Sequence, residues 1–228
     1  MKGDEKMKKL FLILGLLVCL MLTACRRDSL VGHSLDSEDG VITTAKPVIY
    51  LYPQEECKVD VSLDYCGELT CTYPKYEGQW SVIARPDGTL FDNRGQEYAY
   101  LYWEGVGYEN FDFSRGFCVA GEDTAAFLET ALEKLGLTRR EANEFIIYWL
   151  PLMEGNAYNV ISFQTETYEQ AAKLTVSPQP DTLIRVFMAW YAAETPVELP
   201  AQALTAPQRE GFTVVEWGGS FIPCNRSR

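Results

Sequence analysis

The chain has 228 residues, of which 47% are hydrophobic and 23% are charged, and its formal net charge at pH 7 is −12. This composition excludes an intrinsically disordered chain and a protein with many membrane spans. A negative surface repels phosphates and therefore argues against nucleic-acid binding. The length leaves room for one domain or two small ones.

The N-terminus predicts an export signal. Lys6, Lys8 and Lys9 precede an apolar run, residues 10–22, that is shorter than a typical transmembrane helix. The run ends in Leu22-Thr23-Ala24-Cys25, which resembles the lipobox of bacterial lipoproteins. That resemblance implies cleavage after residues 1–24 and a diacylglycerol on the Cys25 sulfur. The lipid would hold the protein on the outer side of the cytoplasmic membrane, in the cell envelope. An uncleaved N-terminal anchor is the alternative.

The remaining chain divides into three parts. Residues 25–45 are polar and without pattern, which predicts a lipidated cysteine followed by a flexible tether. We expect a single folded domain over residues 46–222 and a short tail over 223–228, with two subdomains as the alternative. Translation starts at Met1 or at Met7, since the segment after Met7 is the more typical signal.

The first part of the expected domain consists of strands. Residues 58–65 alternate, with Val59, Val61 and Leu63 on one face and polar residues on the other, which is typical of a half-exposed strand. Turn residues and prolines separate several such runs at intervals of roughly ten residues. The expected strands cover residues 47–52, 58–65, 69–73, 80–85 and 98–103.

Two helices and further strands follow. We expect Asp123 to cap a helix that Gly136 ends, and Thr138 with Glu141 to form a capping box for a second helix that Pro151 ends. The later strands are predicted over 158–163, 172–176, 183–190 and 212–217, with an extended loop over 194–210. The pattern predicts a β-rich α+β fold with antiparallel, sandwich-like sheets and a two-helix insertion.

The chain lacks the residues of several common chemistries. Its one histidine, His33, lies in the expected tether, which argues against Ser-His or Cys-His catalysis. The sequence contains no Walker loop, dinucleotide-binding fingerprint or zinc motif, so we expect no cofactor and no metal site. Five cysteines follow Cys25, an odd number, so at least one is unpaired within the molecule. Of these, Cys71 and Cys118 are expected to be small buried residues.

Three segments combine aromatic rings with a carboxylate, as a sugar site requires. Two carboxylates that flank one bond could also cleave a glycoside without a histidine, although no residue is assigned a catalytic role. Packing in the core is the competing interpretation. Arg185, inside an apolar strand, needs a partner if it points inward. The candidate ligand-binding residues are Tyr102, Trp103, Glu104, Glu144, Tyr148, Glu216 and Trp217.

Four segments stand out together: Lys46-Pro47-Val48-Ile49-Tyr50-Leu51-Tyr52-Pro53, Tyr102-Trp103-Glu104, Tyr148-Trp149-Leu150-Pro151 and Arg185-Val186-Phe187-Met188. They resemble an uncharacterised family of secreted or lipid-anchored proteins from gut-type Gram-positive bacteria, with distant relatives in fungi. The resemblance covers most of residues 46–222 and implies a shared fold, but it implies no activity, cofactor or catalytic residue.

The sequence thus predicts a lipid-anchored, extracytoplasmic protein. Its leading functional hypothesis is a non-enzymatic binding or envelope-associated module, with glycan or cell-wall material as the candidate ligand. A carboxylate-dependent, glycan-active hydrolase is one alternative, and a purely structural lipoprotein is another. The expected partner is the membrane, through the lipid on Cys25, and the pattern identifies no protein partner.

Overall fold

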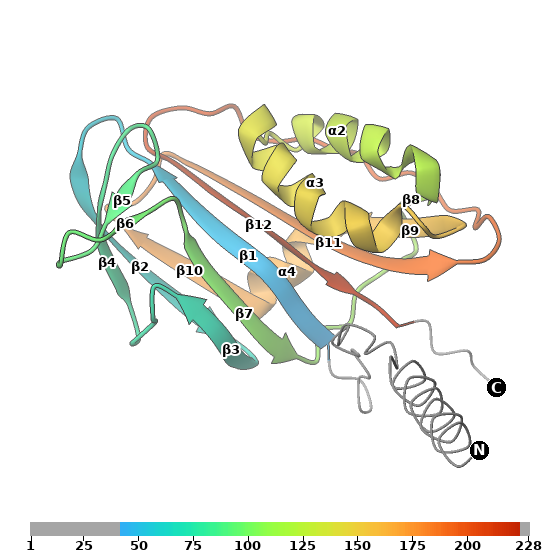
Figure 1. The fold of residues 1–228 in the computed structure, drawn as a ribbon, viewed down its shortest axis with the longest axis horizontal. Coiled ribbons are helices and arrows are strands. Elements are labelled where there is room, and N and C mark those ends of the chain that lie inside the picture. Colours follow the sequence, from blue (N-terminus) through green and yellow to red (C-terminus); the bar gives the residue numbers. More distant parts are fainter. Residues whose placement is uncertain (1–41, 224–228) are drawn as a thin grey trace, which may run out of the picture. The chain divides into compact units, whose positions relative to one another are not determined.

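A computed structural model describes residues 42–223 of the chain (Figure 1). The expected signal segment, Cys25, His33 and Cys224 lie outside the described residues. The first strand begins at Ile42, four residues before the expected start of the domain. No described helix has both the length and the apolar character that a membrane span requires.

Two sheets form most of the molecule. The seven-stranded sheet has, in spatial order, β3 (Glu68–Tyr73), β7 (Leu101–Gly107), β1 (Ile42–Tyr52), β12 (Thr213–Phe221), β11 (Thr182–Ala193), β9 (Tyr158–Phe163) and β8 (Phe117–Ala120). The five-stranded sheet has the order β10 (Ala172–Ser177), β2 (Cys57–Tyr65), β4 (Trp80–Ala84), β5 (Leu90–Phe91) and β6 (Glu97–Tyr98). Strands β11 and β12 run parallel, and the other pairs are antiparallel. The β-rich α+β prediction with mainly antiparallel sheets is confirmed.

The long helices cover one face of the seven-stranded sheet. Helices α2 (Thr124–Lys134) and α3 (Arg139–Met153) lie over β12, β11 and β9 (Figure 1). Phe145 and Trp149 of α3 pack with Val215 and Trp217 of β12 in one apolar core. The expected insertion therefore forms a layer. A 3-10 turn (Gly121–Asp123) directly precedes α2. A short helix, α4 (Thr165–Ala171), lies on the opposite face of the sheet.

The second face of the seven-stranded sheet packs against the five-stranded sheet. Val59 of β2 and Val82 of β4 share a core with Leu51 of β1 and Val214 of β12. Since β12 is central in its sheet and covered on both faces, all of its residues from Thr213 to Ser220 are buried. This explains why apolar and polar residues do not alternate along its sequence.

The predicted helix boundaries hold where a local motif determines them. Glu141 N–H donates to Thr138 Oγ1 at 3.3 Å, and Thr138 N–H donates to Glu141 Oε2 at 2.7 Å, which confirms the capping box. Gly136 has a φ of +85° and ends α2, with Leu137 N–H donating to Leu132 O at 3.0 Å. That geometry is a Schellman motif, in which glycine carries the left-handed residue without strain.

Two helix predictions are wrong in detail. Asp123 precedes α2 but its side chain caps nothing, because Asp123 itself has helical torsions. Pro151 does not end α3, which continues to Met153. Proline removes the hydrogen bond to the carbonyl of Ile147, and the Ile147 side chain is 73% exposed, so that carbonyl lies on the face where water can satisfy it.

The strand expected over 98–103 is divided between the two sheets. Strand β6 ends at Tyr98 in the five-stranded sheet, and β7 begins at Leu101 in the seven-stranded sheet. The chain therefore changes sheet at residues 99–100. Strand β8 and helix α4 were not expected from the sequence, and both are too short to carry a clear periodicity.

The cysteines within the described residues are unpaired. Cys71 is exposed on β3, an edge strand, so its expected burial is wrong. Cys118 is partly buried, and its sulfur lies 3.3 Å from the backbone nitrogen of Val197, which donates to it.

Candidate functional site

Two of the predicted ligand-binding residues, Trp103 and Glu216, belong to a buried polar cluster. The Glu216 carboxylate is fully buried and accepts hydrogen bonds from Trp103 Nε1 at 3.0 Å and from Tyr168 OH at 2.9 Å. Arg185 donates to its other oxygen from Nε at 2.6 Å, and the Arg185 side chain is only 3% exposed. We call these four residues the Glu216 cluster.

The sheet register brings the charges of the Glu216 cluster together. Arg185 of β11 is paired directly with Glu216 of β12, so both side chains point toward the five-stranded sheet. Burial acts to lower the pKa of the Arg185 guanidinium, but the neighbouring Glu216, Tyr168 and Glu169 together raise it by more. Burial and Glu216 also hold the pKa of Tyr168 well above its usual range. Arg185 therefore stays charged, and it has the inward partner that its position requires.

Trp217, another predicted ligand-binding residue, points the other way along β12. Its ring lies 5.3 Å from that of Phe145 in an edge-to-face contact beneath α3 and is fully buried. The structure corrects the assignment of three residues to a binding site. The side chains of Trp103, Glu216 and Trp217 are fully buried and cannot contact a ligand. For these three residues the core-packing interpretation is the right one.

The other four predicted residues lie together at a partly exposed surface. Tyr102 and Glu104 point outward from β7, and Glu144 and Tyr148 lie one turn apart on α3. This surface exists because the long helices leave β7 and β3 at the margin of the sheet (Figure 1). We define the tyrosine patch as Lys46, Tyr100, Tyr102, Glu104, Glu144 and Tyr148, together with Tyr50, which is itself buried and bonds Glu144.

Lys46 occupies the middle of the tyrosine patch. Its ammonium nitrogen lies 5.2 Å from the ring centroids of Tyr100 and Tyr102 and 6.0 Å from that of Tyr148. Its backbone has a φ of +59° at the irregularity between Ala45 and Val48 in β1. Left-handed torsions are unfavourable for a residue with a side chain, and a following proline makes helical torsions worse still. The fold therefore holds Lys46 in a strained conformation.

The carboxylates of the tyrosine patch are held by neighbouring donors. Glu104 accepts a hydrogen bond from the backbone N–H of Lys46 at 3.3 Å, and Glu144 accepts one from Tyr50 OH at 2.9 Å. Burial and the Glu104 carboxylate raise the pKa of Tyr102 and of Tyr148. The patch thus presents protonated tyrosine hydroxyls, acidic acceptors and one ammonium group.

A small hollow of about 140 Å³ adjoins the tyrosine patch at Tyr50. Tyr50 and Tyr52 stack nearly parallel there, with ring centroids 6.1 Å apart. The hollow adds polar groups next to the aromatic surface. Its lining consists of Tyr50, Tyr52, Asp87, Gly88, Thr89, Glu97, Tyr98, Ala99 and Arg140.

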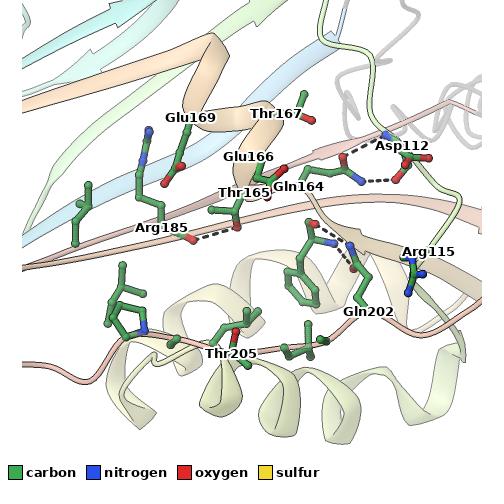
Figure 2. A pocket seen from close by; sticks show the side chains of 18 residues that line it. Asp112, Arg115, Gln164, Thr165, Glu166, Thr167, Glu169, Arg185, Gln202 and Thr205 are labelled. Atoms are coloured by element: carbon green, nitrogen blue, oxygen red, sulfur yellow. Dashed lines mark hydrogen bonds between the residues drawn. The ribbon is translucent and has the colours of Figure 1, made fainter.

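A larger groove, of about 650 Å³, lies between α4, the start of β11 and residues 202–207 (Figure 2). Several of its polar side chains bond to the protein itself. The Gln202 amide bonds both the N–H and the C=O of Phe163, at 2.8 and 3.0 Å. Gln164 bonds the backbone of Asp112 in the same way. Since these amides are occupied, the tyrosine patch is the better candidate site.

Sequence reasoning missed Lys46, Tyr50 and Tyr100 as members of the site. The signal available was the alternation of tyrosines in Tyr50/Tyr52 and Tyr100/Tyr102, which places each pair on one face of an extended segment. Within residues 42–223, no group of three or more His, Cys, Asp or Glu side chains is placed to hold a metal ion.

Comparison with known proteins gives one informative match. The chain is 38% identical over 96 residues to a protein of Butyrivibrio fibrisolvens named "Uncharacterized protein in bglA 3'region". The match covers 41% of this chain and 94% of that protein. No protein-family model matches the chain. No solved structure matches it either.

Proposed function

This chain belongs to the family of the Butyrivibrio fibrisolvens protein, and for this member we propose a non-enzymatic function, the binding of glycan or cell-wall material through the tyrosine patch. The relative's name gives a gene position and no activity, so the proposal rests on the geometry of the patch. The observation that carries it is the arrangement of three partly buried tyrosine rings around Lys46.

The chemistry of the tyrosine patch suits a sugar. Flat aromatic faces bind the apolar faces of pyranose rings, while hydroxyls and carboxylates bind sugar hydroxyl groups. Tyr50 and Tyr100 pack edge to face at 5.3 Å, which limits their motion before a ligand arrives. Such preorganisation lowers the entropy that binding costs. The adjoining 140 Å³ hollow offers a place for a neighbouring part of the ligand.

Binding is favoured over hydrolysis because the structure removes one candidate acid. Glu216 lies in a buried ion pair with Arg185 and cannot reach a substrate. A hydrolase would then depend on Glu104 and Glu144, which would have to flank one glycosidic bond about 5–10 Å apart. Both already accept hydrogen bonds from the protein. Product analysis after incubation with oligosaccharides tests this alternative.

The proposal includes a location. If Cys25 carries a lipid, the 17 residues from it to Ile42 span at most about 60 Å when fully extended. The folded domain would then bind material close to the outer side of the cytoplasmic membrane. Metabolic labelling with a palmitate analogue tests the anchor, with Cys25→Ser as the control that should lose the label.

Titration of the full-length protein tests the binding function. The ligand panel contains peptidoglycan fragments and oligosaccharides of glucose, xylose and galacturonic acid. Binding is measured first by thermal shift and then by calorimetry. A ligand at 100 times its Kd should stabilise the fold by about 2.7 kcal/mol. We expect at least one glycan to bind and both Tyr102→Ala and Tyr148→Ala to weaken binding at least tenfold.

Tyr108→Ala is the matched control, because Tyr108 is 78% exposed and lies six residues beyond Tyr102, about 20 Å along an extended strand. It should bind as the wild type does. Absence of binding to every glycan, or equal binding by Tyr102→Ala and the wild type, would overturn the proposal.

A further inference from the structure

We infer that the tyrosine patch selects acidic glycans, whose sugar carboxylate pairs with the Lys46 ammonium. This inference rests on the proposed glycan-binding function and makes Lys46 its specificity-determining residue. It concerns sugars of the uronic-acid class, in which a carboxylate replaces the hydroxymethyl group of the ring.

The charged groups of the tyrosine patch are not equally satisfied. Glu104 accepts the backbone N–H of Lys46, and Glu144 accepts the hydroxyl of Tyr50. Among the described residues, the Lys46 ammonium has no carboxylate within ion-pair distance; its one hydrogen bond, to Tyr100 OH, is 3.5 Å long. Glu104 and Glu144 also have no cation within ion-pair distance among the described residues, but each accepts a hydrogen bond of 3.3 Å or less, whereas the hydrogen bond of the Lys46 ammonium is 3.5 Å long. The ammonium is therefore the least well bonded of the three charged groups, and a ligand that completes its bonding carries a negative group.

The backbone keeps the Lys46 ammonium in place. A lysine on an ordinary strand extends its flexible side chain into water, where the ammonium is fully hydrated. Here the strained torsions at Lys46 direct the side chain back over the rings of Tyr100 and Tyr102. Ring faces attract a cation but supply no hydrogen-bond acceptor as strong as a carboxylate. Strain of this kind concentrates at functional sites.

The surroundings of Lys46 explain why the anion should belong to a sugar. A free anion would meet a protein of formal charge −12, with Glu104 and Glu144 nearby. A uronic acid gains a second contribution, because its ring can stack on a tyrosine while its carboxylate meets the ammonium. A carboxylate paired with an ammonium is expected to improve affinity about ten- to a hundredfold over the same sugar without the charge.

Calorimetry on the full-length protein tests the inference. The ligands are three-residue oligomers of galacturonic acid and of mannuronic acid, each compared with its own methyl ester, which keeps the sugar and removes the charge. We expect the wild type to bind one of the acids at least tenfold more tightly than its ester. Lys46→Met keeps a similar length without the charge and should abolish that preference, while Lys46→Arg should keep most of it.

The outcomes separate this inference from the proposed function. Equal affinity for acid and ester, or an unchanged preference in Lys46→Met, overturns the role of Lys46. Binding of neutral glycans alone also overturns it but leaves the proposed function standing. No binding of any glycan overturns both. A thermal unfolding curve of each variant, with an unchanged midpoint within about 2 °C, shows that the variants compared are folded.

Discussion

The Glu216 cluster and the tyrosine patch both combine aromatic rings with carboxylates and a cation, but the cluster lies in the core and the patch lies at the surface. In the sequence, Trp103-Glu104 and Glu216-Trp217 look equivalent, since each joins an indole to a carboxylate. In the fold, Trp103 is buried and Glu104 is partly exposed, whereas Glu216 and Trp217 are both fully buried. The difference lies in the place of each strand, because β12 is central and β7 is next to an edge.

This comparison shows that coverage of a strand, rather than its composition, decides what a carboxylate does. On β7 one face meets the core and the other is left at the margin of the helical layer. On β12 helices cover one face and the second sheet covers the other, so Glu216 needs an internal cation, which Arg185 provides. Forming such a buried pair contributes little net stability compared with apolar side chains of the same size, whereas removing one partner is costly.

The largest predicted effect is the difference in stability between variants of the two carboxylates, Glu216 and Glu104. Glu216→Gln should lower the free energy of unfolding by about 3–5 kcal/mol, because the buried Arg185 charge loses its counter-charge. Glu104→Gln, the matched change in the tyrosine patch, should cost about 1 kcal/mol or less. Urea unfolding of both variants measures the difference. Equal costs would contradict the division into core and surface.

A pH series compares a core tyrosine with a patch tyrosine. The native pKa of Tyr168 is raised, so its contribution to stability is present below the unfolded pKa of about 10 and is lost as the pH rises above it. Between pH 10 and 11, wild type should lose about 1 kcal/mol more stability than Tyr168→Phe. The corresponding difference for Tyr148→Phe should be smaller, because water screens a partly exposed group.

Unfolding free energies of wild type and both variants at pH 8, 10 and 11 supply the measurement. At pH 8, Tyr168→Phe should cost about 1 kcal/mol for the lost bond to Glu216. A pH dependence that Tyr168→Phe leaves unchanged would show that Tyr168 ionises as easily in the fold as in the unfolded chain.

The smallest predicted effect concerns the backbone strain at Lys46. Lys46→Gly should be about 1 kcal/mol more stable than Lys46→Ala, because glycine adopts a φ of +59° without the steric cost that a Cβ brings. Chemical unfolding of the two variants compares them directly. If alanine is as stable as glycine there, Lys46 does not have left-handed torsions in solution.

Local patterns in the sequence predicted much of the fold. Alternation over 58–65 matches β2 (Cys57–Tyr65), and the Thr138–Glu141 capping box marks the start of α3. These features depend on residues within one turn or one strand. The sequence did not predict the parallel pairing of β11 with β12, which joins Arg185 to Glu216 across 31 residues of chain.

The candidate site was predicted in part for the same reason. Aromatic residues beside carboxylates identified Tyr102, Glu104, Glu144 and Tyr148, yet they identified buried residues equally well. Distinguishing the two requires the order of strands in the sheet, which is set by long-range pairing. The position of Lys46 over the tyrosines depends on one unusual backbone torsion. The dipeptide Lys46-Pro47 does not by itself predict that torsion.

The most direct test of this account is a titration of the ¹⁵N-labelled full-length protein with trigalacturonate, followed by nuclear magnetic resonance. The account predicts the largest shift changes at the backbone amides of Lys46, Tyr102 and Glu104, with the indole N–H signals of Trp103 and Trp217 nearly unmoved. Changes concentrated along residues 202–207, or none at the tyrosine patch, would contradict it.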